Sequence, residues 1–179
     1  LNFFSLFKRK LIYNFKKKIS IDNDSISIDS LDRLFYHYGS DKADIFKKTE
    51  SKSHGYSKFY KQKIEKLKNR KINILEIGSY AGASAAAFAK YLPKSNIFCF
   101  DINISNFEYK SKKIHVFGID ITNQKKTIKT LNKIADKFKI KEFDIIIDDG
   151  SHNLSDILIG LKCFFKHLRN KGLYVIEDF

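Results

Sequence analysis

The sequence predicts an α/β fold in which a doubly wound parallel sheet of about five strands follows an N-terminal helical extension. Two observations support this fold class. After residue 70, short apolar segments alternate with longer segments whose apolar residues have helical spacing. The chain also has 179 residues, 43% of them hydrophobic, which is enough for one sizeable core. Strands connected by helices form parallel sheets with right-handed crossovers.

The first 30 residues are predicted to be a basic amphipathic helix followed by a linker. Phe4, Phe7, Leu11 and Phe15 recur at helical spacing within residues 1–19, with lysines between them. Such a helix packs on the domain, packs on a second subunit of a homo-oligomer, or makes a peripheral contact with an anionic membrane. Residues 20–30 are rich in turn and cap formers, so we expect a boundary there and a domain over 31–179.

The domain is predicted to begin with a helix from Leu31 to about Tyr38, ended by Gly39, and a second helix over about 56–69. Pro93 is expected to stop the first helix that covers the sheet. The predicted strands lie near 72–77, 96–101, 113–117, 143–148 and 173–177. Two later helices carry faces that we expect to be buried: Ile128, Leu131, Ile134, Ala135 and Phe138 in one, and Leu154, Ile157, Leu158, Leu161, Phe164, Phe165 and Leu168 in the other.

The composition limits the partners and the location. The net charge is +14, but only four basic residues are arginines, the side chain that suits bidentate base and phosphate recognition, so no nucleic-acid partner is expected. The isolated Cys99 and Cys163 suggest buried thiols in a reducing cytosol. The sequence contains neither an apolar run of about 18 residues nor a leader with a cleavage site. We therefore expect a cytoplasmic protein, with residues 1–19 as a contact to the inner face of the membrane in one interpretation.

Acidic residues end three of the predicted strands. Glu76 closes the first, Asp148 and Asp149 the fourth, and Glu177 and Asp178 the fifth. The carboxyl ends of parallel strands meet at one edge of a sheet, where ligands of this fold class bind. The sequence therefore predicts a ligand site there.

The loop after the first predicted strand favours a nucleotide-like cofactor. Small residues dominate this loop, so backbone amides and a helix N-terminus can approach a ligand closely. Its candidate binding residues are Gly78, Ser79, Tyr80, Gly82 and Ser84. The dinucleotide fingerprint is G-x-G-x-x-G, and Tyr80 and Ala83 occupy its second and third glycine positions, which argues against NAD.

Two further acids suit the same cofactor. Asp101 ends the second strand, where it can accept hydrogen bonds from ribose hydroxyls; alternatively, it caps the next turn. Asp120 follows the third strand and could receive an adenine amino group.

These residues resemble the cofactor motifs of class I S-adenosylmethionine-dependent methyltransferases, which have a Rossmann-like fold. The resemblance rests on residues 74–78 with Asp101, Asp120 and Asp148. It implies that S-adenosylmethionine contacts these residues and their neighbours, including Glu76, Ile102 and Ile121. Transfer of a sulfonium methyl needs alignment of oxygen, carbon and sulfur rather than a protein nucleophile.

A narrower resemblance is to the metal-dependent sugar O-methyltransferases of macrolide biosynthesis and related cephalosporin-pathway proteins. It is carried by residues 147–152 and 175–178, with 39–42 and 54–60 nearer the N-terminus. The resemblance implies Mg²⁺ held by Asp149, Glu177 and Asp178, with His152 as the base that takes the proton of a sugar hydroxyl. Oxygen ligands suit Mg²⁺, and an imidazole with a pKa near about 6.5 can accept a proton at neutral pH.

The resemblance implies a small-molecule or glycan substrate and a sheet of seven strands. The chain stops at Phe179, so the domain is expected to be C-terminally truncated, without the last part of that sheet. Two alternatives follow. One is a non-catalytic remnant that binds the cofactor, and the other is an RNA methyltransferase, which the positive charge motivates.

Overall fold

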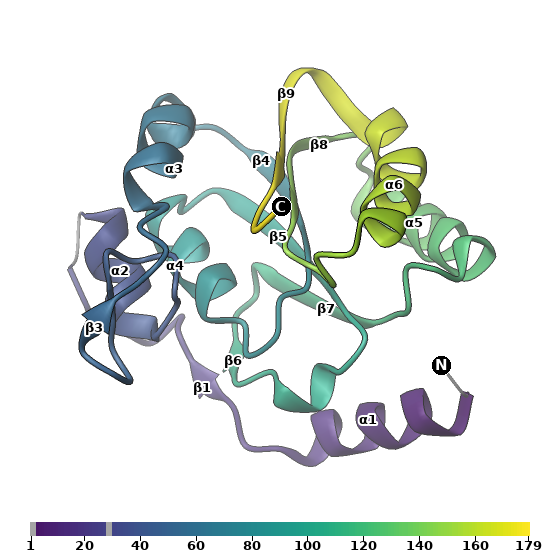
Figure 1. Ribbon diagram of the computed structural model, residues 1–179, viewed down its shortest axis with the longest axis horizontal. Coiled ribbons are helices and arrows are strands. Elements are labelled where there is room, and N and C mark those ends of the chain that lie inside the picture. Colours follow the sequence, from purple (N-terminus) through teal and green to yellow (C-terminus); the bar gives the residue numbers. More distant parts are fainter. Residues whose placement is uncertain (1–2, 28–29) are drawn as a thin grey trace.

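The structure, a computed structural model, describes residues 3–27 and 30–179 and has a central parallel sheet between two helical layers (Figure 1). The sheet order is β7-β5-β4-β8-β9, so the strand order reverses direction between β4 and β8. This Rossmann-like arrangement confirms the predicted fold class. The strands are β4 (Ile72–Ile77), β5 (Ser95–Asp101), β7 (Ile114–Gly118), β8 (Phe143–Asp148) and β9 (Leu168–Ile176).

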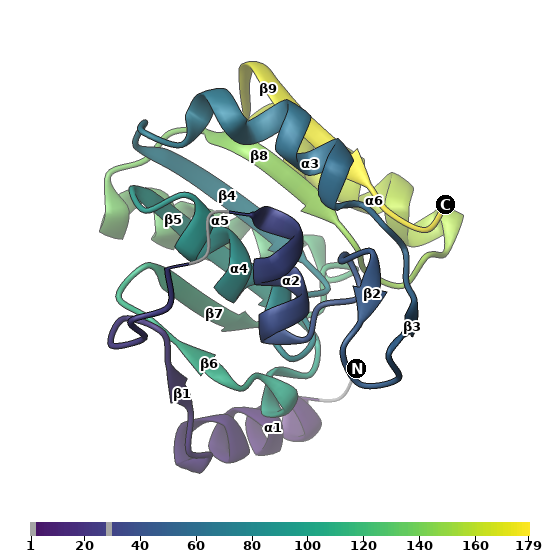
Figure 2. The ribbon, with the colours of Figure 1, turned by 90° about the vertical axis from the view of Figure 1, so that its left-hand side faces the viewer.

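Helices cover both faces of the sheet, and Figure 2 shows the two layers from the side. On one face lie α2 (Leu31–Tyr38), α3 (Ser57–Ile64) and α4 (Ala83–Tyr91), and on the other α5 (Gln124–Phe138) and α6 (Leu154–Phe164). Ile145 and Ile147 of β8 enter the first core and Ile146 enters the second. A strand covered on both faces reads as a continuous apolar run, which is why it stood out in the sequence.

The N-terminal segment packs along the β7 side of the sheet. Helix α1 (Phe3–Phe15) contacts β7 and the short 3₁₀ helix Ile104–Asn106, and β1 (Ile19–Ser20) pairs in parallel with β6 (Tyr109–Lys110). Ile21 is 1% exposed and belongs to the core. The beginning of the segment expected to be a linker is thus attached to the domain; residues 28–29 of that segment lie outside the described residues. Strand pairing and one buried isoleucine outweigh the turn-forming composition.

The loop after α2 forms a small hairpin from β2 (Ile45–Phe46) and β3 (Ser51–Lys52). Gly39 ends α2 as predicted, with its amide bonded to the carbonyls of Phe35 and Tyr36. Helix α3 is shorter than expected and continues only as the 3₁₀ turn Glu65–Leu67.

The prediction for α6 and β9 was wrong in two respects. Helix α6 ends at Phe164 and is followed by the 3₁₀ turn Phe165–His167, and β9 already begins at Leu168. The expected buried face is also too wide, because Leu154, Leu158 and Phe165 are more than half exposed. Only Ile157, Gly160, Cys163 and Phe164 of α6 are buried. One sheet can cover only one narrow side of a helix, so the remaining apolar residues point away from it.

The other helix with a predicted apolar face is α5. Its Leu131 and Ile134 are buried, whereas Ile128 is 37% exposed.

Across the described residues, no helix combines the length and the apolar character that a bilayer span requires.

Candidate active site

The acidic strand ends meet at one edge of the sheet, as the sequence predicted. The ladder pairs Ile77 with Asp148 and Asp148 with Ile176, so the residues that follow these positions lie in one row. The Asp149 amide donates to the carbonyl of Ile77 at 3.0 Å, and the Glu177 amide donates to that of Asp148 at 2.9 Å. The edge lies where the strand order reverses, the usual ligand position in open parallel sheets.

A cavity of about 330 Å³ opens at this edge between the ends of β4, β5 and β8. Its size suits a small molecule such as a nucleoside. Apolar walls and a few polar groups line it, among them the predicted residues Gly78, Asp101, Ile102, Asp120 and Ile121. Gly150, Ser151 and Asp156 were not predicted to line it. Gly150 and Ser151 lie in the turn that follows Asp149, and Asp156 lies in the first turn of α6.

Gly78 allows two backbone segments to meet at the mouth of this cavity. Its φ is +81°, and a Cβ there would lie 1.8 Å from the carbonyl oxygen of Asp149. Only glycine fits this conformation and this contact. The close approach brings the cofactor loop and the acidic end of β8 together.

Asp101 organises the loop from the far side of the cavity. Its Oδ2 accepts from the Tyr80 amide at 2.7 Å, and its Oδ1 accepts from the Asn103 amide at 2.5 Å. Asp101 therefore does cap the following turn while it lines the cavity, so the two sequence interpretations are compatible. Each carboxylate oxygen can accept a second hydrogen bond, so Asp101 has the capacity to accept from a ribose hydroxyl as well.

The remaining loop residues divide between the surface and the interior. Tyr80 is 62% exposed, while Ser79 and Ser84 are buried. A second hollow of about 130 Å³ includes Ser79, Tyr80, Ser84 and Lys42 and shares Gly78 with the larger cavity. Gly82 is the N-cap of α4 and lines neither hollow.

Two predicted cofactor acids, Glu76 and Asp148, lie beneath the site and do not line the cavity. Glu76 is 1% exposed, and burial raises its pKa to about 7, although Lys42 and the hydroxyl of Ser84 favour its charged form. Burial likewise raises the pKa of Asp148 to about 6. One oxygen of each carboxylate has no hydrogen-bond partner among the described residues. A cationic or polar cofactor group at this edge would suit that arrangement.

Beside the cavity, Asp149, His152 and Asp178 each offer one ligand atom, and these atoms lie within 4.8 Å of one another. His152 Nε2 is 4.0 Å from Asp149 Oδ1. Two residues of the N-terminal part complete the group, since Tyr56 donates to Asp178 and His54 Nδ1 lies 3.2 Å from the same carboxylate. Two carboxylates and an imidazole are a donor set that fits a divalent cation.

Glu177 lies apart from this group because both of its oxygens are engaged. The Lys42 ammonium contacts Glu177 Oε2 and Asp149 Oδ2, each at 2.5 Å, and the Tyr60 hydroxyl donates to Glu177 Oε1. Lys42 is itself 2% exposed. Burial disfavours its charged form, but Glu177 and Asp149 outweigh this effect and raise the pKa of Lys42.

Sequence reasoning missed the role of Lys42. The sequence indicated only a polar loop that could cover the cofactor, and residues 39–42 resemble the family pattern. Neither signal shows where the flexible Lys42 side chain ends. The fold places the ammonium between two carboxylates 107 and 135 residues away.

A cavity of nucleoside size at a parallel sheet edge, next to side chains that could hold a cation, is an arrangement typical of cofactor-binding α/β proteins. The chain belongs to the methyltransferase-domain family, which matches residues 75–179. It is 31% identical, over 83% of its length, to L-olivosyl-oleandolide 3-O-methyltransferase of Streptomyces antibioticus, and 29% identical, over 70%, to mycinamicin VI 2''-O-methyltransferase of Micromonospora griseorubida. It covers 36% and 31% of those proteins, so it spans about a third of their length.

A solved structure has the same fold. The MycE methyltransferase of mycinamycin biosynthesis, in complex with Mg and SAH, superimposes with a TM-score of 0.69 at 26% identity. The match covers 86% of this chain and 37% of that one.

Proposed function

We propose that this chain transfers a methyl group from S-adenosylmethionine to a sugar hydroxyl of a glycosylated metabolite or glycan, in a Mg²⁺-dependent reaction. The observation that carries this proposal is the contact at Gly78, which joins the cofactor-sized cavity to the cluster of Asp149, His152 and Asp178. The named relatives support the sugar as acceptor, because they methylate sugars carried by oleandolide and mycinamicin.

The proposed cofactor pose uses the cavity as the structure has it. Asp101 accepts from the ribose hydroxyls, and Asp120 accepts from the adenine amino group, while Ile102 and Ile121 cover the base. Ser79, Tyr80 and Ser84, which line the smaller hollow, surround the methionine part, and Gly82 begins the helix behind them. Glu76 and Asp148 contribute negative charge beneath it, which favours the sulfonium cation.

The proposed chemistry is an in-line displacement. The acceptor oxygen forms a bond to the methyl carbon as the carbon–sulfur bond breaks, which leaves a methyl ether and S-adenosylhomocysteine. The hydroxyl proton passes to His152 Nε2, and the carboxylate of Asp149, 4.0 Å away, stabilises the imidazolium that forms. A bound Mg²⁺ would make the hydroxyl a stronger acid.

Asp149, Glu177 and Asp178 are the proposed ligands of that ion. Glu177 can take part only after Lys42 moves away, because the Lys42 ammonium now compensates its charge. Titration with Mn²⁺, followed by electron paramagnetic resonance, tests the set. If Glu177 is a ligand, Glu177→Gln weakens Mn²⁺ binding about as strongly as Asp178→Asn. If His152 is the ligand instead, His152→Ala weakens Mn²⁺ binding to that extent and Glu177→Gln does not.

The decisive experiment is calorimetric titration of the chain with S-adenosylhomocysteine, with and without Mg²⁺, beside Asp101→Ala. We expect saturable binding that the variant weakens at least about tenfold, because each lost charge-assisted hydrogen bond costs about 1.5–3 kcal/mol. Equal binding by the variant, or none by a folded chain, would contradict the proposed site. A screen of sugar acceptors for methyl transfer then tests turnover.

A second candidate function is cofactor binding without catalysis. Lys42 favours it, because its buried ammonium already neutralises the carboxylates that a metal would need. In that case S-adenosylhomocysteine binds with the same affinity with and without Mg²⁺, and no acceptor is methylated.

We also propose that α1 contacts an anionic membrane surface from the cytoplasmic side. The helix is fastened to the domain by polar groups, since Arg9 donates to the Ile102 carbonyl at 2.8 Å and Lys16 to that of Asn106 at 3.0 Å. Tyr13 packs on Phe107 on the inner side of the helix. On the outer side, Phe4, Phe7 and Phe15 are 73%, 51% and 87% exposed.

Sedimentation with vesicles containing phosphatidylserine tests this proposal. We expect binding that Phe7→Ser/Phe15→Ser abolishes. A concentration-dependent dimer that the same variant dissociates, without vesicle binding, would instead assign α1 to a subunit interface.

A further inference from the structure

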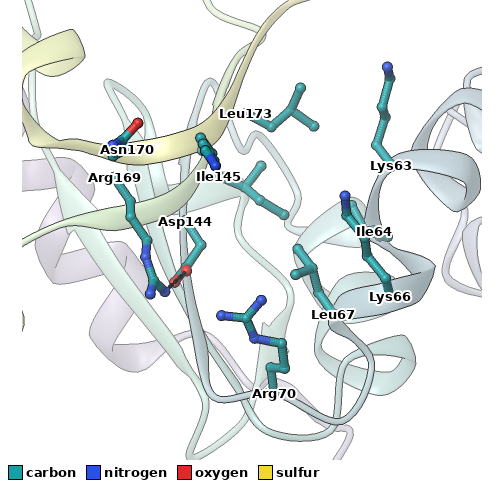
Figure 3. A pocket seen from close by; sticks show the side chains of 12 residues that line it. Lys63, Ile64, Lys66, Leu67, Arg70, Asp144, Ile145, Arg169, Asn170 and Leu173 are labelled. Carbon is teal, nitrogen blue, oxygen red and sulfur yellow. Dashed lines mark hydrogen bonds and ion pairs between the residues drawn. The ribbon is translucent and has the colours of Figure 1, made fainter.

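A further cleft, which we call the basic cleft, opens at the opposite end of the sheet from the cofactor cavity (Figure 3). Its volume is about 430 Å³. Residues 63–70 form one wall, residues 169–173 of β9 form the other, and Asp144 and Ile145 of β8 lie between them. These β8 residues are at the amino-terminal end of the strand, about 13–17 Å along the sheet from Asp149. The cleft is therefore separate from the proposed methyl-transfer site.

The cleft is strongly basic. Its only acid among the described lining residues is Asp144, and both oxygens of that carboxylate are engaged, with Arg169 Nη1 at 2.8 Å and the Asn73 amide at 2.9 Å. The cations in the lining are Lys63, Lys66, Arg70, Arg169 and Lys171. Five positive charges around one paired acid produce a field that attracts anions.

The arginines distinguish this cleft from a lysine-rich surface in general. The chain has 34 basic residues, of which four are arginines, and two of these four line the cleft. Figure 3 shows the guanidinium of Arg70 extending toward the pair of Arg169 and Asp144 from the other wall. An anion between the two guanidinium groups would relieve their mutual repulsion and accept bidentate hydrogen bonds.

The backbone of β9 builds one wall of the cleft. Leu168 pairs with Phe143 and Leu173 with Ile145, so residues 169–172 bulge out of the ladder. Lys171 has a φ of +61°, and a Cβ on Gly172 would lie 2.8 Å from the Arg169 carbonyl oxygen. A bulge of this kind redirects the side chains it carries.

We propose that this cleft binds a phosphate-bearing small molecule. A di- or triphosphate group lies between Arg70 and Arg169, and the group attached to it packs on Leu67 and Leu173, which are half-buried in the lining. A single concave cavity of this volume suits a small ligand rather than a nucleic-acid strand. The inference does not depend on the proposed methyl transfer.

Calorimetric titration of the full chain with inorganic tripolyphosphate and with ATP tests the inference. Saturable binding of tripolyphosphate supports the phosphate site, and tighter binding of ATP supports the apolar wall. The ATP titration is repeated with Asp101→Ala, because adenosine could enter the cofactor cavity; phosphate binding in the cleft is expected to survive that substitution.

Arg70→Gln is the main variant, and Lys129→Gln/Lys133→Gln, two exposed lysines of α5, is the charge control. We expect the first to weaken tripolyphosphate binding at least about tenfold and the second to change it less than about twofold. Arg70→Lys should recover only part of the affinity, since lysine lacks the planar fork.

Circular dichroism and thermal unfolding of each variant confirm that it is folded. Equal weakening by Arg70→Gln and by the control would show non-specific charge attraction and overturn the proposal. Absence of saturable binding of both probes to the wild-type chain would also overturn it.

Discussion

The two ends of the central sheet carry opposite charges in opposite environments. At the carboxyl end, Glu76, Asp148 and Glu177 are buried, and Lys42 is the only buried cation among the described residues. At the amino-terminal end, the cations that line the basic cleft are exposed and surround one acid, Asp144. The net charge of +14 describes neither end, because it averages a buried acidic site and an exposed basic one.

The difference between these ends is energetic as well as chemical. A buried charge loses its hydration and is tolerated only with a close partner, whereas an exposed charge keeps its water and interacts weakly with its neighbours. Substitutions at the acidic end should therefore have large effects on stability, and equivalent substitutions at the basic end should have small ones.

Lys42→Met is expected to have the largest effect. It leaves the buried carboxylate of Glu177 and the half-buried one of Asp149 without their cation, which should lower the free energy of unfolding by about 3–5 kcal/mol. Urea denaturation at neutral pH measures it, with the exposed Lys66→Met as the matched control. A loss below about 1 kcal/mol would mean that solvent already screens the pair.

Gly78→Ala should come next. The added methyl would overlap the Asp149 carbonyl in a backbone conformation that already disfavours alanine, so we expect a loss of about 2–4 kcal/mol and of S-adenosylhomocysteine binding. Gly39→Ala is the control, since its φ is also positive, at +79°, but a Cβ there meets no atom within 4 Å. Similar losses in both variants would show that φ strain alone matters.

Glu76→Gln should change the pH dependence of stability. The folded chain holds the pKa of Glu76 at about 7, above its ordinary value of 4.5, so the folded state binds the proton more tightly than the unfolded one. The free energy of unfolding should therefore fall by about 2–3 kcal/mol as the pH rises from about 4.5 to 7.

The variant should lack this fall, whereas the exposed Glu142→Gln should keep it. Urea denaturation at several pH values gives the profiles. Superimposable profiles for Glu76→Gln and the wild type would show that Glu76 does not titrate differently on folding.

Arg169→Gln should have the smallest effect on stability. Arg169 has 49% of its side chain exposed, and Asp144, at 12%, keeps the hydrogen bond from the Asn73 amide when Arg169 is replaced. We therefore expect a loss below about 1 kcal/mol that salt reduces further. Thermal unfolding at low and high salt measures it. A loss as large as that of Lys42→Met would remove the contrast between the two ends.

The sequence indicated much of the sheet because the relevant signals are local. Buried strands such as β4 and β8 read as apolar runs, and the acids that follow them sit at fixed positions in the chain. Parallel topology then brings these acids to one edge. The positions of Gly78 and Asp101, at the ends of β4 and β5, were predicted in the same way.

Other features had no local signal. The outward side of α6, with Leu154 and Leu158, has the same spacing as a buried face, and only the position of the sheet shows which residues are covered. The bulge of β9 was hidden for a similar reason: residues 169–172 do not resemble a strand, and their place follows from pairing with β8.

The sequence by itself determined the order of the five strands of the central sheet and the acidic character of one sheet edge, since periodicity and strand ends are properties of neighbouring residues. Only the tertiary structure decided how those acids are balanced. Lys42 reaches Asp149 and Glu177 because α2 and the loop after it fold over the end of the sheet. Contacts between residues more than 100 positions apart depend on how whole elements pack, and no local pattern of residues records that packing.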